Sequence, residues 1–337
     1  MVYVGSCAGV FYAFDALTGG LSWSFDVSGD GAYEFHSNPL ILDSVVYFGT
    51  DEGKSSKQGS LYALNRLSGE LLWKLNVENG VPSDPAILDS LIYVVNYAGI
   101  LLAVNRATGV TVWEFGRAPV EEDNSVLTDL LGESKPKRGR SNPMVLDNSV
   151  IFHGNPQKLY AVDGQSGQEI WSHKLTDKIS TQLMLVDNLV AYGTESKSIV
   201  FVNSVDGTTV RVSTQPLSPR SAMKLHDGRL IYMGCLEENG SKREVASIDP
   251  DNGSVHWTAS MDGLGETKGF WYSPRIHVWK DRVILGTSTG LLAGYSVSDG
   301  ALVFSCQFGG RIRGIGSHRD ILYVGTYGGK LYAMRLE

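Results

Sequence analysis

One short phrase returns along the whole chain and limits its fold more than any other feature. In the clearest copy, Gly59 to Trp73, a glycine opens an apolar stretch that contains Ala63 and Asn65, and Gly69 precedes the closing tryptophan. The other copies, some of them weaker, begin at Gly9, Gly99, Gln157, Ser198, Glu244, Gly290 and Gly329. The seven steps from Gly5 to Gly325 average about 46 residues, and a fixed period of this length is typical of repeat architectures.

Each repeat predicts four short strands, which we name A, B, C and D. In the second repeat they are expected at about 38–42, 45–50, 60–65 and 70–76. Asp43-Ser44 would form the A–B turn and Ser68-Gly69 the C–D turn, where glycine supplies a positive φ. Four strands at this period predict an all-β fold, an eight-bladed β-propeller of four-stranded antiparallel blades over residues 1–337 as a single domain.

The number of blades has alternatives. The first repeat shows no A strand and the last shows no D strand, so a seven-bladed propeller is the second reading of the pattern. A chain that is a piece of a longer protein would explain the same two gaps. The repeated alanines and tryptophans are expected to pack between neighbouring blades, since a tryptophan can bury about 200 Å².

The pattern Ala-x-[Asp/Asn]-x-x-[Ser/Thr]-Gly-x-x-x-Trp resembles the tryptophan-docking repeat of the pyrroloquinoline-quinone-type, or quinoprotein-like, β-propellers. The resemblance covers nearly the whole chain. That family includes quinoprotein alcohol dehydrogenases, sensor domains, and non-catalytic propellers such as the outer-membrane assembly lipoprotein. The dehydrogenases carry adjacent cysteines above the quinone, whereas Cys7, Cys235 and Cys306 are scattered here. The resemblance therefore favours the non-catalytic branch and no cofactor, with pyrroloquinoline quinone and calcium as the alternative.

The long insertions all fall in B–C or D–A connections, which leave a propeller on one face. They are expected at 28–36, 51–58, 116–140, 236–243 and 262–272. The largest, 116–140, predicts one short helix over 119–132 followed by the basic run Lys135 to Arg140. Insertions on one face of a repeat array often mark the binding face.

The starts of the inner strands place several cations at the mouth of the central channel. Alignment on the Ser-x-Pro pattern puts in one ring His36, Arg140, Ser180, Arg220, Tyr272, and Arg311 or Arg313. Trp271 and Arg275 lie beside this ring in the sequence. Guanidinium groups bind carboxylate or phosphate in a bidentate manner, so the ring predicts a site for a small anionic ligand. Alternatively, these arginines pair with Glu34, Asp84, Glu121 or Glu122 and hold the loops in place.

The predicted function is a non-catalytic scaffold or recognition module that binds a protein partner or an anionic ligand on this face. The alternative is an enzyme at the channel mouth, either one that acts on an acidic saccharide through His36, Tyr272 and Arg140, or a quinone-dependent dehydrogenase. The net charge of −7 argues against nucleic acid as the partner. No apolar run is long enough to span a bilayer, and the histidines show no metal-ligand spacing.

The sequence assigns no location. The given chain shows no signal peptide, and three scattered cysteines suit a reducing compartment. The family resemblance favours an extracytoplasmic one.

Overall fold

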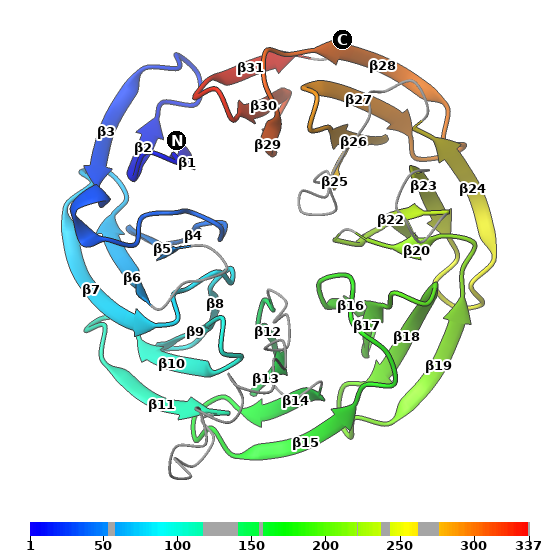
Figure 1. The fold of residues 1–337 in the computed structure, drawn as a ribbon, viewed down its shortest axis with the longest axis horizontal. Helices are drawn as coiled ribbons and strands as arrows, with labels where there is room; N and C mark the ends of the chain where they lie inside the picture. The colour runs from blue at the N-terminus through cyan, green and yellow to red at the C-terminus, as the bar shows by residue number, and fades with distance from the viewer. Residues whose placement is uncertain are drawn as a thin grey trace, which may run out of the picture. The chain divides into compact units, whose positions relative to one another are not determined.

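Eight antiparallel sheets follow one another along the chain, one for each repeat (Figure 1). The computed structural model describes residues 1–52, 58–116, 141–154, 158–220, 222–236, 243–261 and 276–335. Among these residues the one helical segment is a 3₁₀ turn, η1, at Ser28–Asp30. The fold class is the eight-bladed β-propeller that the repeat predicts, and the seven-bladed alternative is wrong.

The chain divides into two units, Met1–Leu175 and Thr176–Glu337, with four sheets in each. The single domain over 1–337 therefore stays a prediction. In the first unit the sheets are β1 (Val2–Gly5), β2 (Val10–Phe14), β3 (Leu21–Asp26); β4 (Leu40–Leu42), β5 (Val45–Asp51), β6 (Gln58–Asn65), β7 (Leu71–Glu78); β8 (Ala86–Leu88), β9 (Leu91–Val95), β10 (Leu101–Asn105), β11 (Thr111–Phe115); and β12 (Met144–Leu146), β13 (Ser149–Gly154), β14 (Lys158–Asp163), β15 (Glu169–Lys174).

The second unit continues the same meander. Its sheets are β16 (Met184–Val186), β17 (Leu189–Gly193), β18 (Ser198–Asn203), β19 (Thr209–Thr214); β20 (Ser218–Pro219), β21 (Lys224–His226), β22 (Arg229–Cys235), β23 (Arg243–Ile248), β24 (Val255–Ser260); β25 (Ile276–Trp279), β26 (Arg282–Gly286), β27 (Leu291–Ser296), β28 (Leu302–Gln307); and β29 (Ile312–His318), β30 (Ile321–Thr326), β31 (Leu331–Arg335). The first and last sheets have three strands, without A and without D respectively, as predicted.

Turn chemistry explains why each repeat breaks where it does. In the β4–β7 sheet, Asp43 has a φ of 52° in the A–B turn and Gly69 has a φ of 74° in the C–D turn. The side chain of Asn65 accepts hydrogen bonds from the backbone N–H groups of Leu67 and Ser68 and so holds the C–D turn. The short polar residue at the end of strand C is thus a turn residue, as its position in the repeat indicates.

Strand C is the buried centre of each complete sheet. In β6 the side chains of Leu61 to Leu64 are all fully buried. They alternate between two clusters: Tyr62 packs with Phe11 of the preceding sheet, whereas Leu61 packs with Ile92 of the following sheet. The hydrophobic core therefore lies between neighbouring sheets, and each sheet depends on its neighbours for burial.

The repeated tryptophan of strand D docks on the C–D turn of the next sheet. The Trp23 Nε1–H donates to the carbonyl oxygen of Arg66 at 3.0 Å, and the indole lies so close to Gly69 that a Cβ there would come within 2.7 Å of it. Trp73 and Trp113 repeat both contacts in the first unit. The expectation that these tryptophans are packing devices is confirmed.

One sheet of the second unit replaces this tryptophan by arginine. The guanidinium of Arg211 lies 4.1 Å from the centre of the Phe201 ring and donates to the backbone oxygens of Pro250 and Asp251 in the next C–D turn. An arginine stem can cover apolar surface while its planar head donates several hydrogen bonds. Arg211 therefore provides the same link between sheets as an indole.

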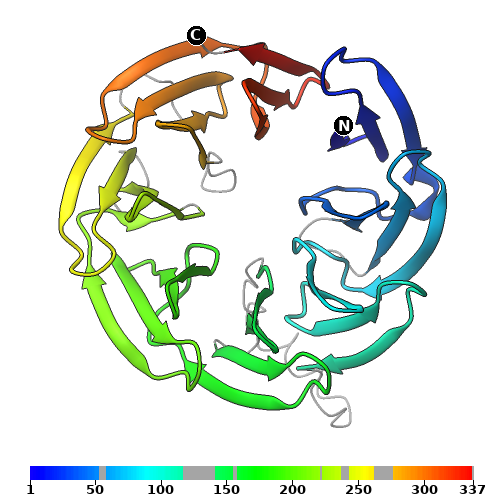
Figure 2. The same cartoon turned by 180° about the vertical axis from the view of Figure 1, so that it is seen from behind.

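In both units, successive sheets place their D strands along one border and their inner strands along the other. Figures 1 and 2 show this for the first unit, where β3, β7, β11 and β15 lie opposite β1, β4, β8 and β12. The predicted inner strands and outer strands are thus found in those roles within each unit.

Candidate functional site

The predicted ligand residues that the structure describes lie at one end of their sheets. In an antiparallel meander the B–C and D–A connections leave from the same end, which we call the BC end, and the A–B and C–D turns leave from the other, the CD end. His36, Arg220, Arg311 and Arg313 lie at or near BC-end connections. Outside the described residues lie Arg140, Trp271, Tyr272 and Arg275, together with Glu121, Glu122, the helix predicted at 119–132 and the basic run 135–140. The predicted ring of cations therefore stays a prediction.

His36 is bound to a buried carboxylate. Its Nδ1 lies 2.8 and 3.0 Å from the two carboxylate oxygens of Asp51, which is completely buried. Its Nε2 lies 3.5 Å from a carboxylate oxygen of the exposed Glu34. His36 thus lies between two carboxylates, and Asp51 is a partner that the sequence analysis missed.

The serine of the Ser-x-Pro pattern ties the start of strand A to the end of strand B. The Val95 N–H donates to the Ser83 Oγ at 2.8 Å, and Ser37 forms the equivalent bond with Gly49. Ser141 and Thr181 accept from the backbone in the same way, always twelve residues further along the chain. The polar residue of this pattern therefore completes a hydrogen bond that the sheet ladder does not supply.

The residues after these serines link neighbouring sheets in the first unit. The carboxylate of Asp84 accepts from the backbone N–H of Asn38 at 2.6 Å and from its side-chain amide at 2.8 Å. The Asp84 N–H in turn donates to the side-chain oxygen of Asn142. Asp84 therefore bridges neighbouring sheets. Its pairing with an arginine stays a prediction, because Arg140 lies outside the described residues.

Arg220 is also paired with a carboxylate. A guanidinium nitrogen lies 3.3 Å from a carboxylate oxygen of Glu195, which the Lys178 ammonium approaches at 2.6 Å. Beside them, burial tends to raise the pKa of Asp177, but hydrogen bonds from the side chain and backbone of Ser196 outweigh it and lower that pKa overall. Cations from two D–A loops thus converge on one acid.

A second arginine lies deeper in the same sheet region. Arg243 is almost fully buried at the start of β23, opposite the buried Cys235 at the end of β22. Burial raises the pKa of the Cys235 thiol, an effect that Arg243 and Arg220 partly offset. Burial lowers the pKa of Arg243. This thiol is therefore a packed neutral group and not an activated nucleophile.

Arg311 and Arg313 surround an exposed aromatic ring. Their guanidinium carbons lie 5.9 and 5.7 Å from the centre of the Tyr327 ring, which is 59% exposed in the B–C turn of the last sheet. Tyrosine and arginine are both enriched among the residues that contribute most to binding at protein interfaces. The sequence analysis named both arginines but missed Tyr327.

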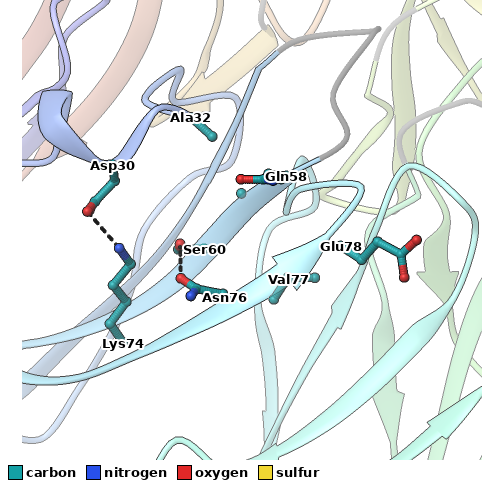
Figure 3. A pocket seen from close by; sticks show the side chains of 9 residues that line it. Asp30, Ala32, Gln58, Ser60, Lys74, Asn76, Val77 and Glu78 are labelled. Atoms are coloured by element: carbon teal, nitrogen blue, oxygen red, sulfur yellow. Dashed lines mark hydrogen bonds and ion pairs between the residues drawn. The ribbon is translucent and has the colours of Figure 1, made fainter.

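A polar pocket of about 430 Å³ lies against β6 and β7 in the first unit (Figure 3). Asp30 and Lys74 form an ion pair of 2.7 Å at one side of it, and Ser60 donates to Asn76 on its floor. Burial tends to raise the pKa of Asp30, but hydrogen bonds from Lys74 and Tyr62 lower it overall. The described side chains that line the pocket are mostly polar.

Asp51 contacts the loop residue His36 in the first unit, and Glu195 pairs with Arg220 in the second. The sequence analysis named neither acid. Each lies two residues after the repeated glycine of strand B, namely Gly49 and Gly193. A search for acids at that one position of the repeat would have found both. No helix in the described part of the chain has the length and apolar character required to cross a bilayer.

Comparison with protein families gives a match over most of the chain. A family model described as "Outer membrane protein assembly factor BamB" matches residues 8–240, 181–307 and 241–337. The outer membrane protein assembly factor BamB of Moranella endobia is 23% identical over 317 residues, which are 90% of this chain and 74% of that protein. A quinoprotein alcohol dehydrogenase, PedH of Pseudomonas putida, is 24% identical over only 41% of this chain and 26% of the enzyme.

Solved structures support the fold. The crystal structure of BamB from Moraxella catarrhalis superposes with a TM-score of 0.74 and covers 99% of this chain and 91% of that one, at 17% identity. At this identity the likeness concerns the eight-bladed architecture alone.

Proposed function

Because the chain belongs to the family described as outer membrane protein assembly factor BamB, we propose that it is a non-catalytic propeller scaffold that binds a protein partner during outer-membrane protein assembly. The observation that carries this proposal is the family match, which extends from residue 8 to residue 337. The relatives' name also supports an extracytoplasmic location, at the outer membrane.

The packing of each sheet suits a scaffold. The core between neighbouring sheets and the docked tryptophans hold each BC end on a rigid base. Loops presented by rigid elements lose little conformational entropy when they bind a partner. The BC-end connections, which carry the insertions, are therefore the surface that we assign to the partner.

Two exposed aromatic residues are the proposed points of contact. Tyr327 is 59% exposed beside Arg311 and Arg313, and Tyr33 is 40% exposed in the connection between β3 and β4. A flat aromatic ring next to guanidinium groups buries a large area and donates hydrogen bonds at an interface. Both lie in BC-end connections, the surface that we assign to the partner.

The pairing of the described cations favours a protein partner over a small anion. His36 and Arg220 each lie next to a carboxylate, so an anionic ligand would compete with Asp51 or Glu195. A protein surface can instead contact the paired groups without separating them. No cofactor remains our expectation, and the partial match to a quinone enzyme is the reason to test it.

In vivo photo-cross-linking tests the assigned surface. A photoreactive amino acid replaces Tyr33 or Tyr327 at the BC end, and matched controls replace Leu67 or Val205, which are 67% and 76% exposed in C–D turns. We expect BC-end positions to form a discrete adduct with a component of the outer-membrane assembly apparatus, identified by mass spectrometry, and CD-end positions to form none.

Loss of the gene is the complementary measurement. We expect a lower amount of folded outer-membrane protein in the deletion strain of the native host, restored by the wild-type chain. Adducts only at Leu67 and Val205, or normal levels of outer-membrane protein in the deletion strain, would contradict the proposal.

A further inference from the structure

The backbone brings three metal-binding side chains together in the first unit. Glu34 and Asp51 exchange two backbone hydrogen bonds, of 2.9 and 3.0 Å, which fasten the loop after β3 to the end of β5. This bridge places His36 against Asp51. One donor atom from each of Glu34, His36 and Asp51 then lies within 4.8 Å of the other two, although 15 residues of sequence separate His36 from Asp51.

The buried carboxylate fixes the orientation of the imidazole ring. A carboxylate can only accept, so the Nδ1–H of His36 donates to Asp51, whose two oxygens lie at 2.8 and 3.0 Å. In the neutral ring this leaves the lone pair on Nε2, directed to the side of Glu34. A carboxylate behind a histidine is the usual outer-shell partner of a metal-bound imidazole, since it sets the tautomer and raises the basicity of the ligand.

The distance between Nε2 and Glu34 suits a cation held between them. It is 3.5 Å, longer than the roughly 2.7–2.9 Å of a charge-assisted hydrogen bond. Two ligands of a tetrahedral zinc ion, each at about 2.0–2.1 Å, lie roughly 3.4 Å apart. When the ring is neutral, a cation between the Nε2 lone pair and the carboxylate oxygen would relieve their repulsion. Glu34 is half exposed and so can adjust and admit an ion from solvent.

From this geometry we propose a zinc site in which the His36 Nε2 and the Glu34 carboxylate bind the ion and Asp51 orients the imidazole. Nitrogen and carboxylate donors with open positions suit Zn²⁺ better than Ca²⁺ or Mg²⁺, which prefer oxygen ligands. Water completes the coordination. The ion would fasten the loop of residues 28–36 to strand β5, independently of any partner.

Direct metal binding tests the proposal in a Cys7→Ser background, because the exposed Cys7 thiol could bind zinc by itself. Equilibrium dialysis should find one zinc ion per chain, and Co²⁺ should give the visible absorption bands of a four-coordinate site. His36→Gln and Glu34→Gln should each weaken binding at least ~10-fold, and Asp51→Asn should weaken it by roughly 10–100-fold, as outer-shell changes do.

A surface pair provides the matched control. The Nε2 of His226 lies 3.6 Å from the carboxylate of Asp227, and the pair belongs to no group of three donors among the described residues. His226→Gln should leave zinc affinity unchanged. Glu34 is half exposed, so Glu34→Gln should fold normally even if Asp51→Asn does not. An absence of saturable binding, or an affinity that neither His36→Gln nor Glu34→Gln changes, would overturn the proposal.

Discussion

The two ends of the sheets follow different rules. At the CD end of the first unit, three tryptophans make the same two contacts with the next turn, with indole-to-carbonyl distances of 2.9 to 3.2 Å. At the BC end the contacts change from sheet to sheet. His36 pairs with Asp51 in one sheet, whereas the Asn96 side chain bonds the backbone of Glu78 and Ile100 in the next. The repeated residues therefore maintain the same contacts at the CD end, whereas contacts at the BC end differ between sheets.

Removal of a docked indole should give the largest loss of stability. Trp23 is almost fully buried, and its N–H bonds the next sheet. We expect Trp23→Ala to lower the free energy of unfolding by about 3–5 kcal/mol, measured by urea denaturation. Trp23→Phe keeps most of the ring and loses only the hydrogen bond, so it should lose about 1 kcal/mol. Equal losses in the two variants would mean that the ring itself contributes nothing.

Substitution of two glycines distinguishes the stability lost through backbone strain from the stability lost when the tryptophan can no longer pack on the C–D turn. Gly19 and Gly109 have φ of 71° and 72°, but a Cβ meets the Trp73 indole at Gly109 and meets no atom within 4 Å at Gly19. Gly19→Ala should lose about 1 kcal/mol through left-handed strain alone. Gly109→Ala should lose about 2–3 kcal/mol, because Trp73 must also move. If the two variants unfold at the same urea concentration, the indole is not held against the turn.

The strands and turns of the propeller were predictable because the residues that determine them act locally and recur from repeat to repeat. Glycine in the C–D turn, Asn65 as a turn residue and Trp23 on strand D each act within a few residues or on the adjacent repeat. Because the repeat occurs eight times, the strands of a weakly matching copy can be located by alignment with the clear copies. Where Arg211 replaces the repeated tryptophan, strand β19 still forms, and the arginine bonds the C–D turn of the next sheet as the indole does elsewhere.

The BC end was less predictable for a physical reason. The bonds of His36 to Asp51 and of Arg220 to Glu195 join residues 15 and 25 positions apart in sequence, through loops whose paths the pattern does not determine. Alignment of the repeats identified His36 and Arg220 as candidate site residues. It did not identify Asp51 and Glu195, the acids that they contact. The alignment on Ser-x-Pro used Ser83 only to locate the start of an inner strand. The structure shows that Ser83 also accepts a hydrogen bond from the Val95 N–H.

The hydrogen bonds of Ser37 and Ser83 to the end of strand B, which we call serine clips, are a regular feature of the BC end. Ser83 is completely buried, so Ser83→Ala would leave the Val95 N–H without an acceptor and should lower the free energy of unfolding by about 1–3 kcal/mol. Ser37→Ala, where the clip is half-buried, should lose less, since water can replace the hydroxyl. Hydrogen exchange of the Val95 and Gly49 amides would follow the two clips directly. A larger loss at Ser37 would contradict this ranking.

Acid stability provides the finest comparison between the two ends. Burial tends to raise the pKa of Asp177 at the BC end, but the hydrogen bonds from Ser196 lower it overall. A folded-state pKa below the unfolded value of about 3.9 gives stability that is present above that pH and is lost as the pH falls through the folded value. Asp177→Asn should therefore remove part of the stability at neutral pH, at most about 0.5 kcal/mol because the group is largely solvated, and flatten the acid limb of the stability curve.

Asp206 is the matched acid at the CD end. Hydrogen bonds from Thr208 lower its pKa as well, but the carboxylate is fully exposed. Asp206→Asn should therefore change the acid limb less than Asp177→Asn does, in urea titrations between pH 2.5 and 7 (roughly the window in which carboxylates titrate). A larger effect at Asp206 would contradict this ranking. It would mean that the exposed turn bonds contribute more to the acid response of these sheets than the bonds between loop and strand do.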